Sequence, residues 1–364
     1  MAGVNLYEAL TTLDGSGAIQ PLLAESWTTS EDGLTWAFKL KNGATFQDGS
    51  PIEAKDVVWS VNRLLAINEG PSYLFEGVLS EGSVTEIDSR TVQFQLEKTY
   101  APFLTTTPIL FVVNSDLAAE NAGDGDPWAQ DYIANNSIGA GAFYLDSWER
   151  GAGMTIKAYD GYHLGWTDTG IDEVRFVVTN EEATVKALAA SGELSMSSDA
   201  QAQETYDSIG ALADYRVDKY STATNFYLKL NNSIAPTDDV NIRKAIAYAT
   251  DYDTIRDVIL PGAPLTGPMP PIFADAYPDD IGAPVFDLAK AKEHVDASSY
   301  AGSGPIDIEI MYVAGLAFEE EIGLLMKSIL DTIGFNTILK LSLIHISEPT
   351  RPERIGGGGV GVGK

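Results

Sequence analysis

The three histidines are the side chains of this sequence best suited to acid–base chemistry, because histidine titrates near neutral pH. They are His163, His294 and His345. A hydrolytic triad needs a nucleophile beside such a base and an acid that orients it. No G-x-S-x-G elbow, P-loop, H-E-x-x-H motif or glycine-rich dinucleotide fingerprint accompanies the histidines. We therefore predict no catalytic residues and no enzyme, and we interpret His163 in "GYHLGW" as a surface or wedge residue.

Closely spaced acids are the other candidates for chemistry, since carboxylates bind hard cations. Asp238 with Asp239, and Asp251 with Asp253, could hold a metal, but aspartates also cap helix N-termini. The "DGDP" at 124–127 matches only part of a calcium loop. The chain has no cysteine, which excludes disulfides, thiolate metal sites and a thiol nucleophile. We predict no metal site and no cofactor.

A strand followed by a helix is the clearest pair of elements that could position functional groups. Residues 34–40 alternate between apolar and polar side chains, which predicts a strand. The next helix has two candidate starts. Ser50 could cap it with Pro51 in the first turn, or it could begin one turn later at Glu53 with Asp56 behind it.

Similar patterns continue along the chain and mix hairpins with strand–helix units. They predict a hairpin over 84–98, strands over 142–148, 154–159, 171–179, 224–232 and 306–312, and helices over 182–191, 239–260 (one or two helices), 286–297 and 317–333. This mixture indicates an α/β protein with more than one lobe.

Composition and charge limit the classes of partner. The chain has 364 residues, enough for two or more domains, and 52 acidic against 23 basic residues give a formal charge of −29. Such a charge repels nucleic acid and disfavours an anionic membrane surface. No apolar run approaches the length of a membrane span, and "MAGVNLYEAL" lacks the pattern of a signal peptide.

The last segment differs from everything before it. Residues 341–364, "LSLIHISEPTRPERIGGGGVGVGK", are basic and rich in glycine, whereas the preceding sequence is acidic and amphipathic. "LSLIHISEPTRP" resembles the translation of a sequencing-library adapter. We interpret 341–364 as a non-native tail and expect it to pack against nothing; a flexible native tail is the alternative.

Five segments in order resemble the family 5 extracytoplasmic solute-binding proteins, the peptide- and nickel-type receptors of ABC importers. They are "LAESWTTSEDGLTWAFKLKNGATFQDGSPIEAKDVVWSVNRL", "TVQFQLEKTYAPFL", "SIGAGAFYLDSWERG", "FYLKLNNSIAPTDDVNIRKAIAYATDYDTI" and "FDLAKAKEHV". The chain departs from the family pattern where Ala140 and Ala142 replace the usual Thr and Pro, and where Tyr252 replaces an Arg.

The resemblance implies a fold and a domain division. The fold is α/β and periplasmic-binding-protein-like (type II), in three parts that close on the ligand by hinge motion. Domain I would comprise 1–10 and 138–235, domain II would be the insertion 11–137, and lobe III would be 236–340. Family members extend further at both ends, so we expect a fragment truncated in the last lobe.

The resemblance also implies a function. The chain would be an extracytoplasmic receptor, on the periplasmic or extracellular face of the membrane, that captures a peptide-like or other small organic solute. It would act as a monomer and deliver the solute to the permease subunits of an ABC importer. A ligand-sensing domain of a regulator built on the same fold is the alternative.

In the family, the strand that matches 224–232 borders the ligand cleft. Its alternation places one polar set on one face, namely Asn225, Tyr227, Lys229 and Asn231. We predict that Tyr227 stacks on the solute and that Lys229 meets an acidic group. The opposite face carries Phe226, which we expect in the core. A strand edge at the surface is the alternative.

Two glycines complete the predicted site. Gly139 and Gly141 precede a predicted strand, and glycine lets the backbone approach a neighbour closely because it lacks a Cβ atom. We predict that both lie at the ligand cleft.

Overall fold

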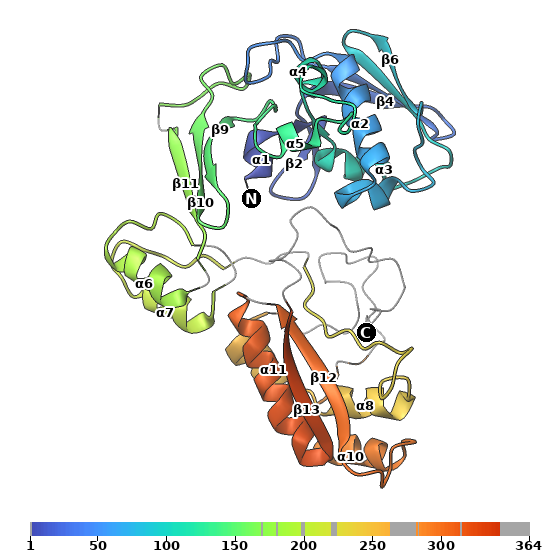
Figure 1. The fold of residues 1–364 in the computed structure, drawn as a ribbon, viewed down its shortest axis with the longest axis vertical. Coiled ribbons are helices and arrows are strands. Elements are labelled where there is room, and N and C mark those ends of the chain that lie inside the picture. The colour runs from blue at the N-terminus through green and yellow to red at the C-terminus, as the bar shows by residue number, and fades with distance from the viewer. Residues whose placement is uncertain are drawn as a thin grey trace. The chain divides into compact units, whose positions relative to one another are not determined.

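The fold is described from a computed structural model, which describes residues 2–168, 170–179, 181–197, 201–219, 224–262, 282, 284–313 and 315–342. The chain divides into two compact units, Met1–Val178 and Thr179–Lys364. Figure 1 shows the elements of each unit, which is described by itself below.

A four-stranded antiparallel sheet forms the core of the first unit. Its strand order is β4-β5-β7-β6. The strands are β4 (Ala24–Thr29), β5 (Thr35–Leu40), β6 (Val84–Asp88) and β7 (Thr91–Gln95). The helix α2 (Ala54–Ile67) packs on β6 and β7. Buried aromatic side chains fill the space beneath the sheet, including Phe38, Phe94 and Phe103, whose rings meet edge to face. The predicted strand 34–40 and hairpin 84–98 are confirmed.

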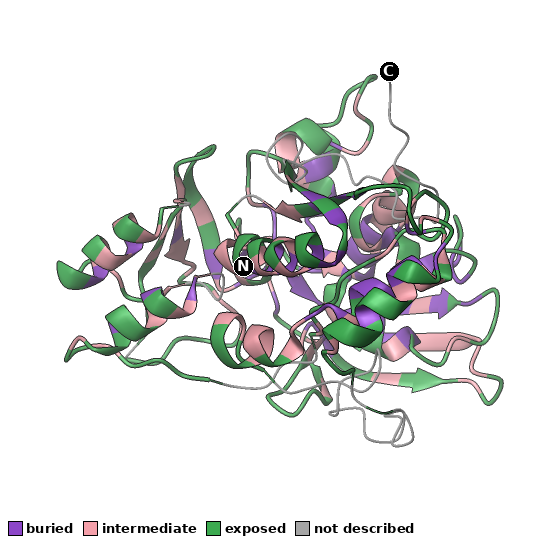
Figure 2. Cartoon of the chain, turned by 90° about the horizontal axis from the view of Figure 1, so that it is seen from below, coloured by how far each residue is buried: buried purple, intermediate pink, exposed green. Residues whose placement is uncertain are grey.

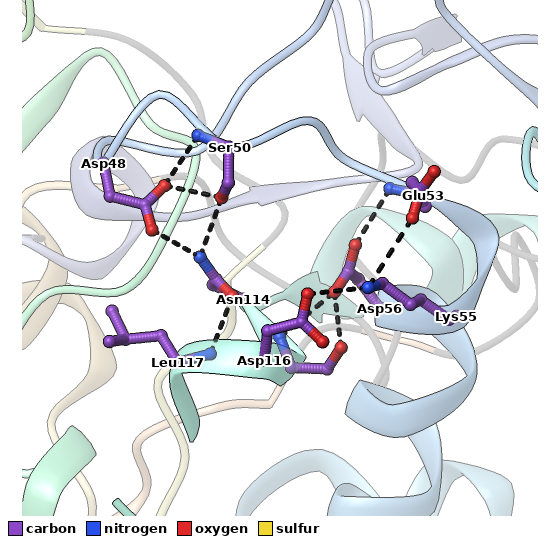
Figure 3. Close-up of polar contacts among 9 residues, drawn as sticks. Asp48, Ser50, Glu53, Lys55, Asp56, Asn114, Asp116 and Leu117 are labelled. Carbon is purple, nitrogen blue, oxygen red and sulfur yellow. Dashed lines mark hydrogen bonds and ion pairs between the residues drawn. The ribbon is translucent and has the colours of Figure 1, made fainter. Parts of the chain in front are cut away.

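The start of α2 decides between the two predicted alternatives. The helix begins at Ala54 after the cap Glu53, whose backbone N–H donates to Asp56 Oδ2 at 2.9 Å. Ser50 serves a different purpose, because its N–H and hydroxyl both donate to Asp48 Oδ1, at 2.9 and 2.6 Å (Figure 3). The later start is confirmed.

Asp56 also joins α2 to α4 (Ser115–Glu120), 59 residues further on. Its side chain is buried, and its Oδ1 accepts from the Ser115 backbone N–H at 3.1 Å and from the Ser115 hydroxyl at 2.5 Å. Asn114 caps α4 and donates from Nδ2 to Asp48 Oδ2 at 2.8 Å (Figure 3). The turn at Asp48 and the starts of both helices are thus one hydrogen-bonded unit.

The first unit also contains several short helices and strands outside its sheets of three and four strands. They are α1 (Gly3–Leu6), β1 (Glu8–Ala9), β2 (Thr11–Leu13), β3 (Ile19–Pro21), η1 (Gly70–Phe75), α3 (Phe103–Thr106), η2 (Thr107–Ile109), β8 (Phe111–Val112) and α5 (Gln130–Ile133). β1 pairs with β8, and β2 pairs with β3.

The turn between β2 and β3 is organised by one exposed carboxylate. Asp14 accepts from Ser16 Oγ at 2.6 Å, from the backbone N–H groups of Ser16 and Ala18, and from Gln20 Nε2 at 2.8 Å. These donors, the Ser16 hydroxyl foremost, lower the pKa of Asp14 from 3.8 to about 2.

We expect Asp14→Asn to destabilise the protein at neutral pH and to matter less in acid. The lowered pKa means that the stabilisation by Asp14 is present above the unfolded pKa and is lost as pH falls from about 4 toward about 2. The measurement is the difference in unfolding midpoint between wild type and variant at several pH values, with the exposed Asp124→Asn as control. A difference that stays constant over this range would contradict the prediction.

A second sheet in the first unit is three-stranded and antiparallel, in the order β11-β10-β9. Its strands are β9 (Phe143–Glu149), β10 (Gly153–Ala158) and β11 (Glu173–Val177). They confirm the strands predicted over 142–148, 154–159 and 171–179. Phe143 and Ile156 pack with Leu6 of α1 in a cluster separate from that of the larger sheet.

The second unit is built around a strand–helix–strand unit. β12 (Ile306–Val313) and β13 (Phe335–Ser342) pair in parallel, and α11 (Ala317–Leu330) connects them and packs on both (Figure 1). Along β12 buried isoleucines alternate with exposed residues. The helices α8 (Val240–Tyr248) and α10 (Leu288–Asp296) complete the core. In Figure 2 the helices carry buried residues on one side and exposed residues on the other.

The remaining elements of this unit are short. They are α6 (Glu182–Ala190), α7 (Gln203–Gly210), α9 (Tyr252–Thr254), one π-helical turn η3 (Ile255–Ile259) and η5 (Asp331–Ile333). The predicted helices over 182–191, 286–297 and 317–333 are confirmed, and the stretch 239–260 forms more than one helix. No helix among the described residues is both long and apolar enough to cross a membrane.

Two predicted segments differ from the structure. The described part of 224–232 forms no strand, because it pairs with no neighbouring strand there. The predicted tail starts too early, since Leu341 and Ser342 belong to β13 and pair with Tyr312 and Val313. Residues 343–364, and with them His345, lie outside the described residues.

Candidate functional site

The segment 224–231 lies beside the first turn of α11 without forming a strand. Leu230 packs against the core of the second unit. Phe226 meets Phe318 of α11 edge to face, with ring centroids 5.6 Å apart and planes at 78°. These two contacts anchor the segment at the end of the helix, near the carboxyl end of β12. In sheets with parallel strands, ligands bind at this edge.

Tyr227 and Lys229 lie together, as the alternation predicted. Lys229 Nζ is 5.3 Å from the centroid of the Tyr227 ring, within the range of a cation–π contact. Tyr227 is 62% exposed, so its ring is accessible to a ligand. Asn225 is half-buried, and Asn231 Oδ1 accepts from the Ser233 backbone N–H at 3.0 Å. Of the predicted polar face, Tyr227 and Lys229 are therefore the pair available for binding.

Phe226 is not in the core, which corrects the prediction. Its side chain is 46% exposed and is held by the contact with Phe318. We expect Phe226→Ala to lower the free energy of unfolding by only about 1–2 kcal/mol, the loss of one aromatic pair and partial burial. Phe38→Ala, at a fully buried position, should cost about 3–5 kcal/mol in the same urea titration. Equal losses in the two variants would contradict this reading.

Carboxylates already occupy the N-terminal end of α11. Glu319 and Glu320 lie in the first turn, and Glu319 Oε2 accepts from the Val313 backbone N–H, at the end of β12, at 2.7 Å. A helix N-terminus attracts anions, and here the protein supplies its own. Among the described residues in this part of the site, Lys229 carries the positive charge that an anionic ligand could meet.

Gly139 and Gly141 lie in the first unit, where the backbone approach predicted for them is to another segment of this chain. A Cβ atom on Gly139 would lie 2.1 Å from the Leu6 carbonyl oxygen, and one on Gly141 would lie 2.2 Å from that of Asn5. Gly141 N–H donates to Leu6 O at 3.0 Å. Their role at a ligand cleft stays a prediction.

Gln47 ties this close contact together and was missed by sequence reasoning. The two N–H groups of its Nε2 are shared among three carbonyl oxygens, those of Leu6 at 2.9 Å, Gly141 at 3.2 Å and Phe143 at 2.5 Å. Its Oε1 accepts from Ser137 Oγ at 2.5 Å. One amide therefore joins α1, the glycine segment and the start of β9. Its position between a strand and the Asp48 turn carries no signal of this role.

A buried polar cluster in the first unit was also missed. His163 Nε2 and Glu8 Oε2 are 2.6 Å apart, and both side chains are only 5% exposed. The Tyr162 hydroxyl donates to Glu8 Oε1 at 2.6 Å. Burial, reinforced by the Glu8 carboxylate, raises the pKa of Tyr162. The surface interpretation of His163 is wrong, because Glu8, 155 residues away, supplies its partner. The wedge interpretation fits its contact with the Tyr162 ring, which meets the imidazole edge to face.

The other acids and the second histidine support the fold. Asp239 and Asp251 cap α8 and α9, accepting from the backbone N–H groups of Asn241 at 2.7 Å and Thr254 at 3.1 Å. Asp126 accepts from the first N–H groups of α5. His294 stacks on Tyr248 at 5.6 Å. Within the described residues, no three His, Asp or Glu side chains gather in a way that could hold a metal ion.

Sequence comparison identifies one family. A sequence model described as "Bacterial extracellular solute-binding proteins, family 5 Middle" matches residues 18–343. A "Probable D,D-dipeptide-binding periplasmic protein" of Escherichia coli is 30% identical over 350 residues, which cover 94% of this chain and 64% of that protein. A dipeptide-binding protein of the same organism is 29% identical, over 86% of this chain and 61% of its own length. The chain thus spans less than two thirds of the length of these curated relatives.

Solved structures show the same fold. The oligopeptide-binding protein AppA of Bacillus subtilis, in complex with a nonapeptide, superposes with a TM-score of 0.80 at 22% identity. The match covers 93% of this chain and 69% of that one. The protein NikA of Brucella suis, in complex with Fe(III)-EDTA, gives a TM-score of 0.75 at 22% identity, over 93% and 69% of the two chains. The predicted periplasmic-binding-protein-like α/β fold is confirmed.

Proposed function

Because the chain belongs to the family 5 bacterial extracellular solute-binding proteins, we propose that it is a receptor that binds a peptide-like or other small organic solute. The family match over residues 18–343 is the observation that carries the proposal. It places the chain among binding proteins rather than enzymes. Peptides are the first class to test, because both relatives described above are named for dipeptides.

The proposal includes a cellular setting and partners. The receptor acts outside the cytoplasm, in the periplasm or at the outer face of the membrane, and delivers its solute to the permease subunits of an ABC importer. It works as a monomer. The relatives' names and the family description support the location.

We also propose the three-part division, with domain I formed by 1–10 and 138–235, domain II by 11–137 and lobe III by 236–340. Three observations support it. Leu6 shares a cluster with Phe143 and Ile156, and Glu8 bonds to Tyr162 and His163, so the first ten residues pack with the part of the later segment that lies in the first unit. The large sheet has a core of its own, and so have α8 to β13.

The ligand site in the second unit centres on Tyr227 and Lys229, with Asn225 and Asn231 beside them in the chain. The support is the exposed ring, the ammonium group next to it and their position at the carboxyl end of β12. In the first unit, Gly139 and Gly141 remain the residues proposed to contact a ligand.

The test is binding in solution. Thermal unfolding of the chain is followed with and without pools of dipeptides to nonapeptides, and hits are measured by calorimetry. A specific ligand at a hundred times its Kd should add about 2.7 kcal/mol of apparent stability. A folded chain that no peptide pool or other small organic solute stabilises would overturn the proposal.

A further inference from the structure

Lys229 is a cation that lies over an aromatic ring and forms no ion pair with any residue that the structure describes. Its Nζ lies over the Tyr227 ring at 5.3 Å, and no carboxylate within the described residues forms an ion pair with it. The chain has 52 acidic residues and only 23 basic ones, so acidic partners are abundant. Lys290 shows the usual case: its Nζ lies 5.4 Å from the Tyr248 ring and also 3.8 Å from Asp287 Oδ2. Among the described residues, no carboxylate therefore neutralises the charge of Lys229, and this charge can meet an anionic group of a ligand.

The backbone that carries this pair is fixed, although the pair itself is exposed. Phe226 is held against Phe318, and Leu230 packs in the core on the other side of the pair. Between these anchors Tyr227 presents a ring that is 62% exposed. A flat exposed ring with a cation above it is a surface that is already organised before binding, which limits the entropy lost on binding.

The neighbouring helix end does not compete for an anion. Glu319 and Glu320 place two negative charges in the first turn of α11, and Glu319 accepts the Val313 N–H at the end of β12. An anionic group of a ligand is repelled there and attracted by Lys229. We therefore expect the anionic group of a ligand to lie beside Lys229 and Tyr227, and not at the N-terminal end of α11.

Resting on the proposed function, we infer that this site binds the free carboxylate of a ligand whose aromatic or other flat side chain lies on Tyr227. The C-terminal residue of a peptide has this chemistry when that residue is aromatic. In such a residue two saturated carbon atoms separate the carboxylate from the ring, so a ring that lies against Tyr227 keeps the carboxylate within reach of the long Lys229 side chain, whose Nζ lies 5.3 Å from the Tyr227 ring centroid. The preferred ligand is a peptide that ends in an aromatic residue with a free carboxylate.

Calorimetry of the whole chain with four peptides tests the inference: Ala-Phe, Ala-Phe amide, Phe-Ala and Ala-Ala. Ala-Phe should bind at least about tenfold more tightly than each of the others, because a hydrogen-bonded charge and an aromatic contact are each worth about this factor. Lys229→Met should abolish the preference for the acid over the amide. Tyr227→Ala should abolish the preference for Ala-Phe over Ala-Ala. Lys290→Met is the matched control, since it removes a lysine over a tyrosine elsewhere, and it should leave all affinities unchanged.

The outcomes separate this inference from the proposed function. If the four peptides bind with equal affinity, or if Lys229→Met keeps the preference for the acid, the inference is overturned while the receptor proposal stands. If the chain binds no peptide but is stabilised by a solute that lacks a carboxylate, the inference is likewise overturned. If 3-phenylpropionate binds as tightly as Ala-Phe and loses affinity in Lys229→Met, recognition of the carboxylate and ring is upheld with a free aromatic acid as the ligand.

Discussion

Gly141→Ala should destabilise the protein by at least about 3 kcal/mol or prevent its folding. The added Cβ atom would lie 2.2 Å from the carbonyl oxygen of Asn5 and 2.5 Å from the carbonyl carbon of Leu6. Both are backbone atoms, so no side-chain rotation can relieve the clash, and close-packed interiors tolerate extra volume poorly. Moving the two segments apart would also weaken the bonds of Gly141 N–H to Leu6 O and of Gln47 to both segments. The measurement is the yield of folded protein and its unfolding by urea.

Gly123→Ala is the matched control, because a Cβ atom there would meet nothing within 4 Å. We expect its free energy of unfolding to stay within about 0.5 kcal/mol of wild type. Gly139→Ala, where the clash is with Leu6 O at 2.1 Å, should resemble Gly141→Ala. A loss below about 1 kcal/mol for Gly141→Ala would show that the two segments are further apart than described.

Asp56→Asn should cost about 2–4 kcal/mol at neutral pH. The carboxylate is 1% exposed and accepts three hydrogen bonds, from the Glu53 N–H and from the N–H and hydroxyl of Ser115. Burial raises the pKa of Asp56, and the three donors oppose this shift. Their hydrogen bonds therefore offset part of the cost of burying the carboxylate. The Asn side chain has one oxygen where Asp56 has two. Its NH2 group would therefore face either the Glu53 N–H or the donors of Ser115. A buried donor left without an acceptor costs about 1–3 kcal/mol.

Asp116→Asn provides the comparison for Asp56, because Asp116 lies in the same region and its side chain is 72% exposed (Figure 3). It pairs with Lys55 at 2.6 Å, and a surface ion pair is worth at most about 1 kcal/mol. Ser115→Ala removes one donor only and should fall between the two. The order of the three unfolding midpoints is the measurement. Equal midpoints for Asp56→Asn and Asp116→Asn would mean that Asp56 is not buried among these donors.

Local patterns in the sequence determined most of the helices and strands. The alternation at 34–40, the hairpin at 84–98 and the helices after 182, 286 and 317 all depend on periodicities of neighbouring residues. The five ordered segments also determined the family, since they preserve a spacing that runs across the chain. These signals are complete within the sequence and need no knowledge of distant contacts.

The segment 224–232 shows where a local pattern misleads. Its alternation of polar and apolar residues is correct, and it placed Tyr227 with Lys229 on one side and Phe226 on the other. A strand, however, also requires a partner strand for its backbone hydrogen bonds, and alternation does not supply one. The same limit explains Phe226, whose neighbour Phe318 covers only part of its ring.

Only the tertiary structure decided the roles that depend on distant partners. The sequence allows α2 to start at Ser50 or at Glu53. The tertiary structure selects Glu53, because Asp56 bonds to Glu53 and, across 59 residues, to Ser115. His163 looked isolated because Glu8 lies 155 residues away. Gly139 and Gly141 predict that their backbone lies close to another group. Only the structure shows that this group is the backbone of Asn5 and Leu6, at the start of the first unit. Such contacts arise from packing, which brings together groups whose types are encoded locally but whose proximity is not.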